Sequence, residues 1–392
     1  MKLPFYTYLI ALLALTTFGC GGKKQQQEDL QLIWSSQPLM IPEDLKESII
    51  SSANELMDEG PYSVLQKTFT PPSGDKHDYM SMGIYWWPNP DNEDSLPYIR
   101  RDGLVNPEVH GITDKRYLNV TQDIAFVCGL AYHITKDEKY AAKSAEVLRH
   151  WFINDSTRMN PNLNFGQGVP GIADGRCYGI IETRDISNVM DAEMLIRSSK
   201  AWGEKDQQQL KNWMSDYLDW LLTSELGKEE FTRPNNHGTW YDVQVSSLAI
   251  AVGDIATAKR ILKGSADRIL EHVDAEGRQP EELARTRTWD YSTMNLKSLM
   301  LLAMLGEKVG VDLWQIPGED DPAIRRAVDF LLPFALAPEA WEYEQVLEFQ
   351  PERIVPLVEQ AILQYPERLE VYTEALKKIG SEDNHIGFYD LP

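Results

Sequence analysis

Two stretches of the chain place hydrogen-bond donors and proton carriers directly before apolar helical runs. The first is RPNNHGTWYDVQ (residues 233–244), in which Asn235 or Asn236 can cap a helix and His237 follows. A helix N-terminus presents backbone N–H groups and the positive end of the helix dipole, so it can hold an anion. In a helix, His237 and Tyr241 would share one stripe. A capped helix with a structural histidine is the competing interpretation.

The second stretch, RQPEELARTRTWDYSTMNLKSLM, sets two arginines and a tyrosine before a strongly apolar helix. If the segment is helical from position 286 onward, Arg287 and Tyr291 share a face because they are four residues apart. Arg285 joins them only through a bend. A surface ion-pair network with Glu281 and Glu282 is the alternative for these arginines.

A long aromatic loop precedes both stretches. Tyr85, Trp86 and Trp87 offer flat apolar faces on which sugar rings can stack, and Arg100 and Arg101 can pair with carboxylates. Such aromatic side chains could equally pin the loop to the body of the protein.

A second loop, MNPNLNFGQGVPGIADGRCYGIIETRDIS, is rich in glycine and amides. Asn164 and Gln167 can hydrogen-bond hydroxyl or carboxylate groups, while Arg176 and Arg184 add positive charge. Any single asparagine here can instead be a turn former. Long ordered loops nevertheless tend to carry function, so the cluster predicts a binding region.

Apolar residues at helical spacing predict helices along nearly the whole chain, and no segment alternates strongly as a strand. Helices are expected within residues 42–61, 123–153, 187–224, 239–273, 291–336 and 366–380. Short turns between them favour stacked antiparallel hairpins. Because no fixed sequence period indicates a solenoid, we predict an all-α fold, an (α/α) toroid that forms an incomplete barrel of about six or seven helix hairpins.

Composition limits the partners. A net charge of −22 argues against nucleic acid, whose phosphates the surface would repel. A hydrophobic fraction of 43% is typical of a globular protein. An acidic polysaccharide stays compatible with this charge if the few basic residues gather in one cleft.

The first residues indicate export. Lys2 is followed by an apolar stretch that is short for a bilayer span and ends just before Cys20. We predict a lipoprotein signal peptide over 1–19, lipidation of Cys20, a tether over 20–30 and a single domain over 31–392. The protein would then be anchored in the periplasm or at the outer-membrane or cell surface of a Gram-negative bacterium. A plain secretory signal is the alternative.

Four motifs occur in order along the chain: YWWPNP with LPYIRRDGLVNPE, NPNLNFGQ with GIIETR, NNHGTWYD, and RTRTWDYSTMNL. They span roughly residues 78–296 and resemble the alginate lyase superfamily of helical polysaccharide lyases, most closely the family 38 type of Bacteroidetes. The resemblance implies a toroid of helix pairs that cleaves 1,4-linked uronic-acid glycans, alginate, polymannuronate or glucuronan, by β-elimination. The products would carry 4,5-unsaturated uronate ends.

The resemblance also implies roles for individual residues. Asn236 and His237 match the pair that faces the uronate, with His237 near the C5 proton, and Tyr291 matches the general acid that also serves as base. Arg285 fits the expected arginine better than Arg287 does. We expect substrate contacts from a further set of side chains: Arg287, Arg184, Asn164, Gln167, Tyr85, Trp86, Trp87, Trp240 and Tyr241.

The chemistry explains these residue types. Removing the C5 proton adds negative charge to the C6 carboxylate, which asparagine, histidine and arginine donors would neutralise. In mannuronate and glucuronate, H5 and O4 lie on the same side, so one tyrosine can act as base and then as acid. In guluronate they lie on opposite sides, which makes His237 the natural base. The pKa of Tyr291 must fall for it to act as a base, and Arg285 and Arg287 are expected to lower it.

No loop has the carboxylate spacing of a calcium site, so we expect neither metal nor other cofactor. We also expect a monomer that binds an anionic polysaccharide and touches a membrane only through its lipid anchor. Two alternatives stay open: a surface glycan-binding lipoprotein without catalysis, and a glycoside hydrolase acting through two carboxylates. The candidate carboxylates of a hydrolase are Asp290, Asp242, Asp185 and Glu182.

Overall fold

The computed structural model describes residues 30–35, 37–318, 321–380, 385–386 and 389–390. The α-helices of these residues are α1 (Glu43–Leu56), α2 (Asp114–Thr135), α3 (Glu138–Leu148), α4 (Ser187–Ile196), α5 (Glu204–Thr223), α6 (Glu225–Phe231), α7 (Asn236–Val252), α8 (Ile255–His272), α9 (Pro280–Leu283), α10 (Thr288–Val309), α11 (Ala323–Leu336), α12 (Val355–Gln364) and α13 (Leu369–Ile379). The short strands are β1 (Met80–Met82), β2 (Trp86–Trp87), β3 (Ile99–Arg100), β4 (Phe165–Gly168), β5 (His385–Ile386) and β6 (Tyr389–Asp390).

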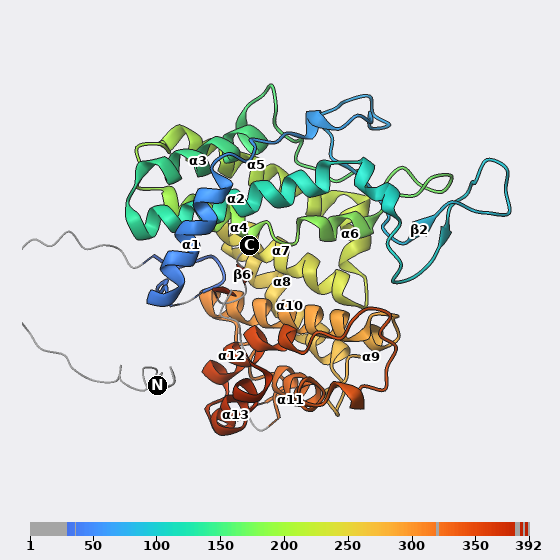
Figure 1. The fold of residues 1–392 in the computed structure, drawn as a ribbon, viewed down its shortest axis with the longest axis vertical. Coiled ribbons are helices and arrows are strands. Elements are labelled where there is room, and N and C mark those ends of the chain that lie inside the picture. The colour runs from blue at the N-terminus through green and yellow to red at the C-terminus, as the bar shows by residue number, and fades with distance from the viewer. Residues whose placement is uncertain (1–29, 36, 319–320, 381–384, 387–388, 391–392) are drawn as a thin grey trace, which may run out of the picture.

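Successive long helices alternate between an inner and an outer position as the chain passes through the molecule (Figure 1). The inner helices α2, α4, α7, α10 and α12 contact one another in that order, and α3, α5, α8, α11 and α13 lie outside them. The single helix α1 packs on α2. This arrangement confirms the predicted all-α toroid. We expected six or seven helix hairpins. The described residues contain five pairs of an inner helix and the outer helix that follows it, together with the single helix α1.

Burial separates the two layers. Thirteen of the 17 residues of α7 are buried, whereas α8, the outer helix that follows, buries only 6 of its 18 residues. An outer helix needs one apolar stripe, but an inner helix is covered on every side. The apolar core extends along the chain from Leu32 to Leu376.

Local signals fix the ends of the helices. The side chain of Asn235 accepts a hydrogen bond from the backbone N–H of His237 and caps α7, as the sequence suggested for one of its asparagines. Gly253 ends α7 with a positive φ of 88°. Lys136 adopts a left-handed conformation in the turn between α2 and α3.

The two long loops are ordered against each other. Strand β1 pairs in parallel with β4, which joins the aromatic loop to the glycine-rich loop. Strands β2 and β3 form an antiparallel hairpin that projects from the body of the molecule (Figure 1). Glycine is needed in the second loop because a Cβ on Gly175 would lie 2.0 Å from the backbone oxygen of Asn164. The loops therefore form one surface beside the helices.

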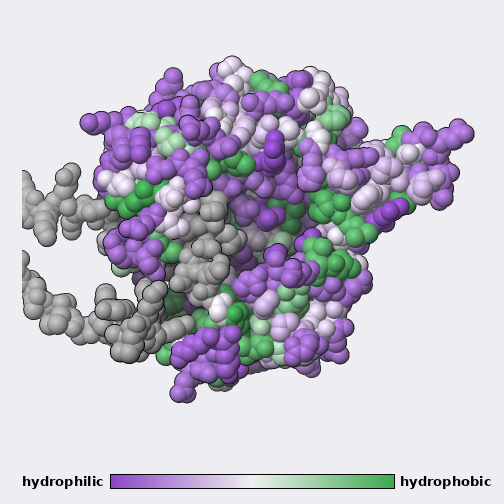
Figure 2. Space-filling model, viewed as in Figure 1, coloured by the Kyte–Doolittle hydropathy of each residue, from purple (hydrophilic) through white to green (hydrophobic). Residues whose placement is uncertain are grey.

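The predicted signal peptide, the lipidation site Cys20 and nearly all of the tether lie outside the described residues. Within the described part of the chain, none of the helices is both long and apolar enough to cross a membrane. Hydrophilic side chains cover most of the face shown in Figure 2, with smaller apolar areas among them.

Candidate active site

A cleft of about 1580 Å³ gathers all four motif stretches. Its lining includes the β2–β3 hairpin, the glycine-rich loop, parts of α2 and α12, and the N-terminal ends of α7 and α10, two helices that pack together. The cationic lining side chains are Arg100, Lys115, Arg176, Arg184, Arg285, Arg287, Lys297 and Arg353. An acidic polysaccharide can bind so acidic a chain only if basic residues gather in one cleft. This cleft meets that condition.

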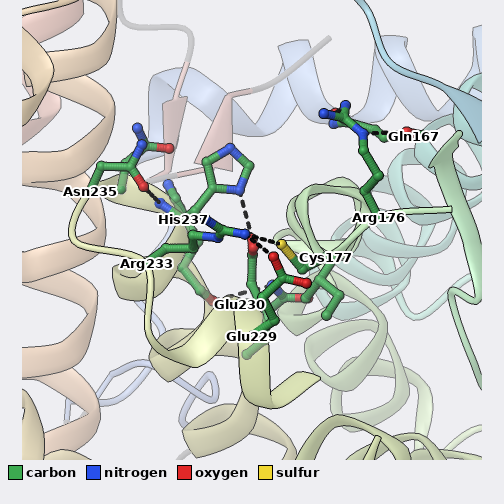
Figure 3. A network of polar contacts seen from close by, with 12 residues as sticks. Gln167, Arg176, Cys177, Glu229, Glu230, Arg233, Asn235 and His237 are labelled. Atoms are coloured by element: carbon green, nitrogen blue, oxygen red, sulfur yellow. Dashed lines mark hydrogen bonds and ion pairs between the residues drawn. The ribbon is translucent and has the colours of Figure 1, made fainter. Parts of the chain in front are cut away.

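A buried carboxylate holds His237 from behind (Figure 3). Nδ1 of His237 lies 2.6 Å from Oε1 of Glu230, a fully buried residue on α6. Because an ionised carboxylate can only accept, Nδ1 carries a proton and Nε2 is the nitrogen left for the cleft. The ring of Tyr178 meets the histidine edge-on at 4.9 Å. The orientation of His237 is therefore fixed before any substrate arrives.

A second buried carboxylate holds Asn236. Its backbone N–H donates to Oε1 of Glu282 over 2.7 Å, and its side-chain Nδ2 donates to Oε2 over 2.8 Å. Burial raises the pKa of Glu282 to about 7, although the hydrogen bonds from Asn236 oppose the rise. Asn236, His237, Glu230 and Glu282 are called the histidine cluster below.

Tyr291 lies in the first turn of α10 and meets side chains from two other segments. Its hydroxyl is 2.5 Å from the hydroxyl of Tyr85 and accepts a hydrogen bond from Nη2 of Arg285 at 3.1 Å. The Arg285 guanidinium also lies 4.2 Å from the centre of the tyrosine ring. Asp102 in turn accepts two hydrogen bonds from Arg285, at 2.8 and 3.1 Å. Tyr85, Asp102, Arg285 and Tyr291 are called the tyrosine cluster below.

The pKa of Tyr291 does not fall, although Arg285 acts on it in the expected direction. Burial raises the pKa of Tyr291 well above its ordinary value, the neighbouring Tyr85 adds to the rise, and Arg285 opposes it without overcoming it. Arg287 does not reach the hydroxyl because Asp290 accepts its Nε and Nη2 hydrogens at 2.9 and 2.7 Å. Tyr291 is therefore a neutral phenol, in the state that a general acid needs.

The two arginines are thereby distinguished. Arg285 contacts Tyr291 and Arg287 does not, which agrees with the assignment of Arg285 as the catalytic arginine. The described carboxylate partners of these arginines are Asp102 and Asp290, so the alternative network with Glu281 and Glu282 does not form.

Four other predicted substrate contacts also line the cleft: Trp86, Gln167, Arg184 and Trp240. Trp240 is 2% exposed, and its Nε1 has no hydrogen-bond partner among the described residues. Arg184 pairs with Asp185 at 3.5 Å. These positions are compatible with the predicted substrate contacts.

Trp87 and Asn164 do not line the cleft, which corrects two of the predictions. Adjacent residues of a strand face opposite ways, so Trp86 faces the cleft and Trp87 turns from it to donate to the backbone oxygen of Leu104. Oδ1 of Asn164 instead accepts a hydrogen bond from Nε1 of Trp220 on the outer helix α5. A sequence pattern alone could not assign these two side chains to a face.

Tyr241 is a third correction. It is 3% exposed, it is absent from the cleft lining, and its hydroxyl donates to the backbone oxygen of Leu221. Helical spacing correctly placed Tyr241 one turn after His237. On an inner helix, however, the same stripe passes from the cleft into the core within one turn.

Three carboxylates of the two clusters were missed from the sequence: Glu230, Glu282 and Asp102. Glu230 lies only seven residues before His237, so a search for acidic neighbours of the histidine could have found it. The sequence suggests Glu282 only as a surface partner of the arginines. Nothing in the sequence indicates Asp102, which lies 183 residues from Arg285.

The carboxylates proposed for a hydrolase are engaged elsewhere. Asp242 is buried and accepts from Arg268 at 2.7 Å, and Glu182 is buried and accepts from the hydroxyl of Tyr79 at 2.9 Å. Asp290 and Asp185 line the cleft but pair with arginines. Across the described residues, no group of three or more His, Cys, Asp or Glu side chains could hold a metal ion.

Comparison with known proteins agrees with this geometry. Residues 63–341 match the family model described as alginate lyase. An alginate lyase from Bacteroides ovatus has a crystal structure that is 33% identical with a TM-score of 0.81, over 85% of this chain and 89% of that one. Alginate lyase A1-III from Sphingomonas species A1 is 13% identical with a TM-score of 0.53, over 88% and 92% of the two chains, and shares the fold. A search among curated proteins found no match.

The family match and the similar Bacteroides ovatus enzyme identify this helical toroid with its cationic cleft as a polysaccharide lyase. The match to the family model covers more than half of the chain, and the Bacteroides ovatus enzyme is similar over most of both chains. The chain belongs to the alginate lyase family.

Proposed function

We propose that the protein cleaves 1,4-linked polyuronates of the alginate type by β-elimination in this cleft. One observation carries the proposal: three groups meet in one cationic cleft. They are the neutral hydroxyl of Tyr291, Arg285, which is hydrogen-bonded to that hydroxyl, and His237, which Glu230 orients. Each of these groups has a task in the elimination. A hydrolase would need two carboxylates facing one bond, and the candidates are paired with other groups.

The reaction starts at C5 of a uronate ring. A base breaks the C5–H bond, and the electron pair spreads into the C6 carboxylate. Donors from Asn236 and Arg285 stabilise the added charge, and preorganised donors of this kind are worth about 3 kcal/mol each. The C4–O4 bond then breaks, a C4=C5 double bond forms, and the hydroxyl of Tyr291 gives its proton to O4.

Two routes are open to the C5 proton. Nε2 of a neutral His237 can take it while Nδ1 stays bonded to Glu230, and this route suits guluronate, whose H5 and O4 lie on opposite sides. Alternatively, Tyr291 first releases its proton to solvent, then takes the C5 proton as base and passes that same proton to O4 as acid, which suits mannuronate and glucuronate. Because the pKa of Tyr291 is raised, the substrate-free state favours His237 as the base.

A panel of uronate polymers tests the proposal. Purified protein is incubated with polymannuronate, polyguluronate and glucuronan, and the ultraviolet absorbance of the unsaturated product is followed beside the release of reducing ends. We expect both signals to rise together on at least one polymer. Reducing ends without absorbance would indicate hydrolysis, and binding without either signal would indicate a glycan-binding protein; each result overturns the proposal.

We also propose that the chain is exported and anchored through a lipid on Cys20. The support is the apolar stretch that ends at this cysteine. Metabolic labelling with palmitate should mark the wild-type protein and leave a Cys20→Ser variant unlabelled and unanchored. An unlabelled wild-type protein would instead indicate a plain secretory signal.

A further inference from the structure

Arg176 differs from its cationic neighbours in the cleft. Six of the other cationic lining side chains each have a carboxylate oxygen within 4.0 Å: Arg100, Lys115, Arg184, Arg285, Arg287 and Arg353. Arg176 has no ion pair with any residue that the structure describes. It donates instead to Gln167, from Nε to the backbone oxygen at 2.9 Å and from Nη2 to Oε1 at 3.3 Å.

Leaving this arginine without a counter-charge is unfavourable. Burial lowers the pKa of Arg176, which reflects the cost of holding a cation away from water. Buried or half-buried charges in proteins are usually paired for this reason. Since no described carboxylate supplies the pairing, a negative charge from outside the protein would satisfy it.

The surroundings of Arg176 hold its guanidinium in one place. The group lies close to two aromatic rings, 5.3 Å from the centre of Trp86 and 5.0 Å from the centre of Tyr178. Both contacts have the geometry of cation–π interactions. Gly83 leaves the necessary space, because a Cβ there would lie 2.7 Å from both Nη2 of Arg176 and Cδ1 of Trp86.

Gln167 supports the same position at a conformational cost. Its φ of 47° is in the left-handed region, which residues other than glycine rarely adopt. In this conformation its backbone N–H donates to Oγ of Ser81 at 2.7 Å, and its two oxygens both accept from Arg176. Strained residues of this kind are concentrated at binding and catalytic sites. Figure 3 shows Arg176 and Gln167 together, apart from the contact of His237 with Glu230.

Arg176 lies beside both reactive clusters without touching the proposed reacting groups. Tyr178, whose ring contacts the guanidinium of Arg176, also meets His237 edge-on at 4.9 Å. The other contacting ring belongs to Trp86, which directly follows Tyr85, whose hydroxyl contacts Tyr291. A sugar ring next to the one being cleaved would therefore bring its substituents within reach of Arg176.

We propose that Arg176 binds the carboxylate of a second uronate ring, in a subsite next to the one where the bond is cleaved. The planar guanidinium can offer a carboxylate a two-point contact, for which arginine is better suited than lysine. The subsite makes consecutive uronate residues, rather than uronates alternating with neutral sugars, the preferred substrate class. This inference rests on the proposed lyase function, since it names a further substrate contact of the same cleft.

The test uses Arg176→Gln with Arg116→Gln as its matched control. Arg116 also lies over an aromatic ring, 4.8 Å from the centre of Tyr117, and also has no ion pair among the described residues, but it is outside the cleft. On the polyuronate that the wild type cleaves best, Arg176→Gln should raise KM at least about tenfold, with kcat changed less than about threefold. Arg116→Gln should change neither constant.

A second substrate separates charge recognition from a general effect. The same polymer is prepared with part of its carboxylates reduced to alcohols, which removes the groups that Arg176 would bind. The wild type should lose affinity for the reduced polymer, and Arg176→Gln should lose much less because its contact is already absent. Arg176→Lys keeps the charge without the planar fork and should fall between the two. If Arg176→Gln folds poorly, the loss of affinity for the reduced polymer is compared between Arg176→Lys and the wild type instead.

The outcomes keep the two proposals apart. An active wild type with an unchanged KM in Arg176→Gln overturns the subsite alone and leaves Arg176 as a packing residue. A wild type without unsaturated product on any polymer overturns the lyase function. Calorimetric titration with a polyuronate hexamer then decides the subsite without catalysis: binding must weaken at least about tenfold in Arg176→Gln, and equal binding overturns it.

Discussion

His237 and Tyr291 face the same cleft, but the protein positions them with partners of very different kinds. The histidine is held by Glu230, a fully buried carboxylate seven residues earlier on the adjoining helix. The tyrosine is held by Tyr85, which lies 206 residues earlier beside a hairpin that projects from the body (Figure 1). Arg285 depends on the same region, through Asp102.

The difference has a physical consequence. Glu230 and Glu282 belong to the helical body, so the histidine cluster can be lost only when that body rearranges. The tyrosine cluster exists only while the hairpin stays docked on the start of α10. Local opening of a segment with few buried contacts costs far less free energy than global unfolding. We therefore expect the tyrosine cluster to be the adjustable half of the site and the histidine cluster to be the rigid half.

The largest effect should come from Tyr291→Phe, which removes the proton donor of the tyrosine cluster and leaves its ring. We expect kcat to fall about a thousandfold, because general acid–base catalysis contributes roughly 10²–10⁴ in rate. Oligosaccharide affinity should change less than about threefold, since the cationic lining is intact. Steady-state kinetics and calorimetric titration measure the two quantities.

Tyr62→Phe serves as the control, because it removes a tyrosine hydroxyl that bonds Glu59 outside the cleft. If Tyr291→Phe retains more than a tenth of the wild-type kcat, the tyrosine is not the acid and the comparison of the two clusters loses its basis.

Glu230→Gln tests the rigid half. The amide can still accept from Nδ1 of His237, but it no longer attracts the proton with a full charge, so the ring loses its fixed tautomer. We expect kcat/KM to fall about thirtyfold, a loss of about 2 kcal/mol in transition-state stabilisation. Nitrogen-15 NMR of the histidine ring should show Nδ1 protonated in the wild type and a mixture of tautomers in the variant.

The matched control is Glu229→Gln, which neutralises the adjacent glutamate, whose side chain is 51% exposed and pairs with Arg233. An unchanged tautomer in Glu230→Gln would show that other contacts, such as Tyr178, orient the ring. The buried carboxylate would then have no role in orienting His237.

The sequence predicted the two halves unequally. Helical periodicity and capping identified α7 and placed Asn236 and His237 at its start, because these signals act within a few residues. The preference for Arg285 over Arg287 rested on the family resemblance alone, since the contact that distinguishes them depends on Asp102, which the fold brings from 183 residues away. Tyr241 was misplaced for a related reason: the pattern gives the stripe of a helix but not the depth at which that stripe enters the core.

Asp102→Asn tests the adjustable half. Burial alone would raise the pKa of Asp102, but the hydrogen bonds and positive charge of Arg285, together with Arg100 and Thr286, outweigh burial and lower the pKa to about 2, so the residue is ionised at neutral pH. The amide would release Arg285 and remove a negative charge that helps to raise the pKa of Tyr291. We expect kcat/KM to fall about tenfold and its alkaline limb to move to lower pH, as measured by a pH–rate profile.

Asp94→Asn is the control within the same hairpin, since Asp94 accepts a hydrogen bond from the backbone of Leu96 away from the cleft. A lower rate with an unmoved alkaline limb would mean that Asp102 only holds the hairpin and does not act on the tyrosine.

The smallest effect is one of stability and belongs to Glu282, behind Asn236. Burial raises the pKa of this carboxyl to about 7, above its unfolded value near 4.5, so the folded protein binds its proton more tightly. The resulting stabilisation is fully present below about pH 4.5 and is lost as the pH rises through about 7. Relative to Glu282→Gln, the wild type should lose up to about 3 kcal/mol of unfolding free energy between pH 4.5 and 8. Urea unfolding of both proteins across this pH range measures the difference in their unfolding free energies. If that difference stays constant with pH, Glu282 titrates as an ordinary glutamate. The histidine cluster would then be open to water, and the contrast between the two halves of the site would disappear.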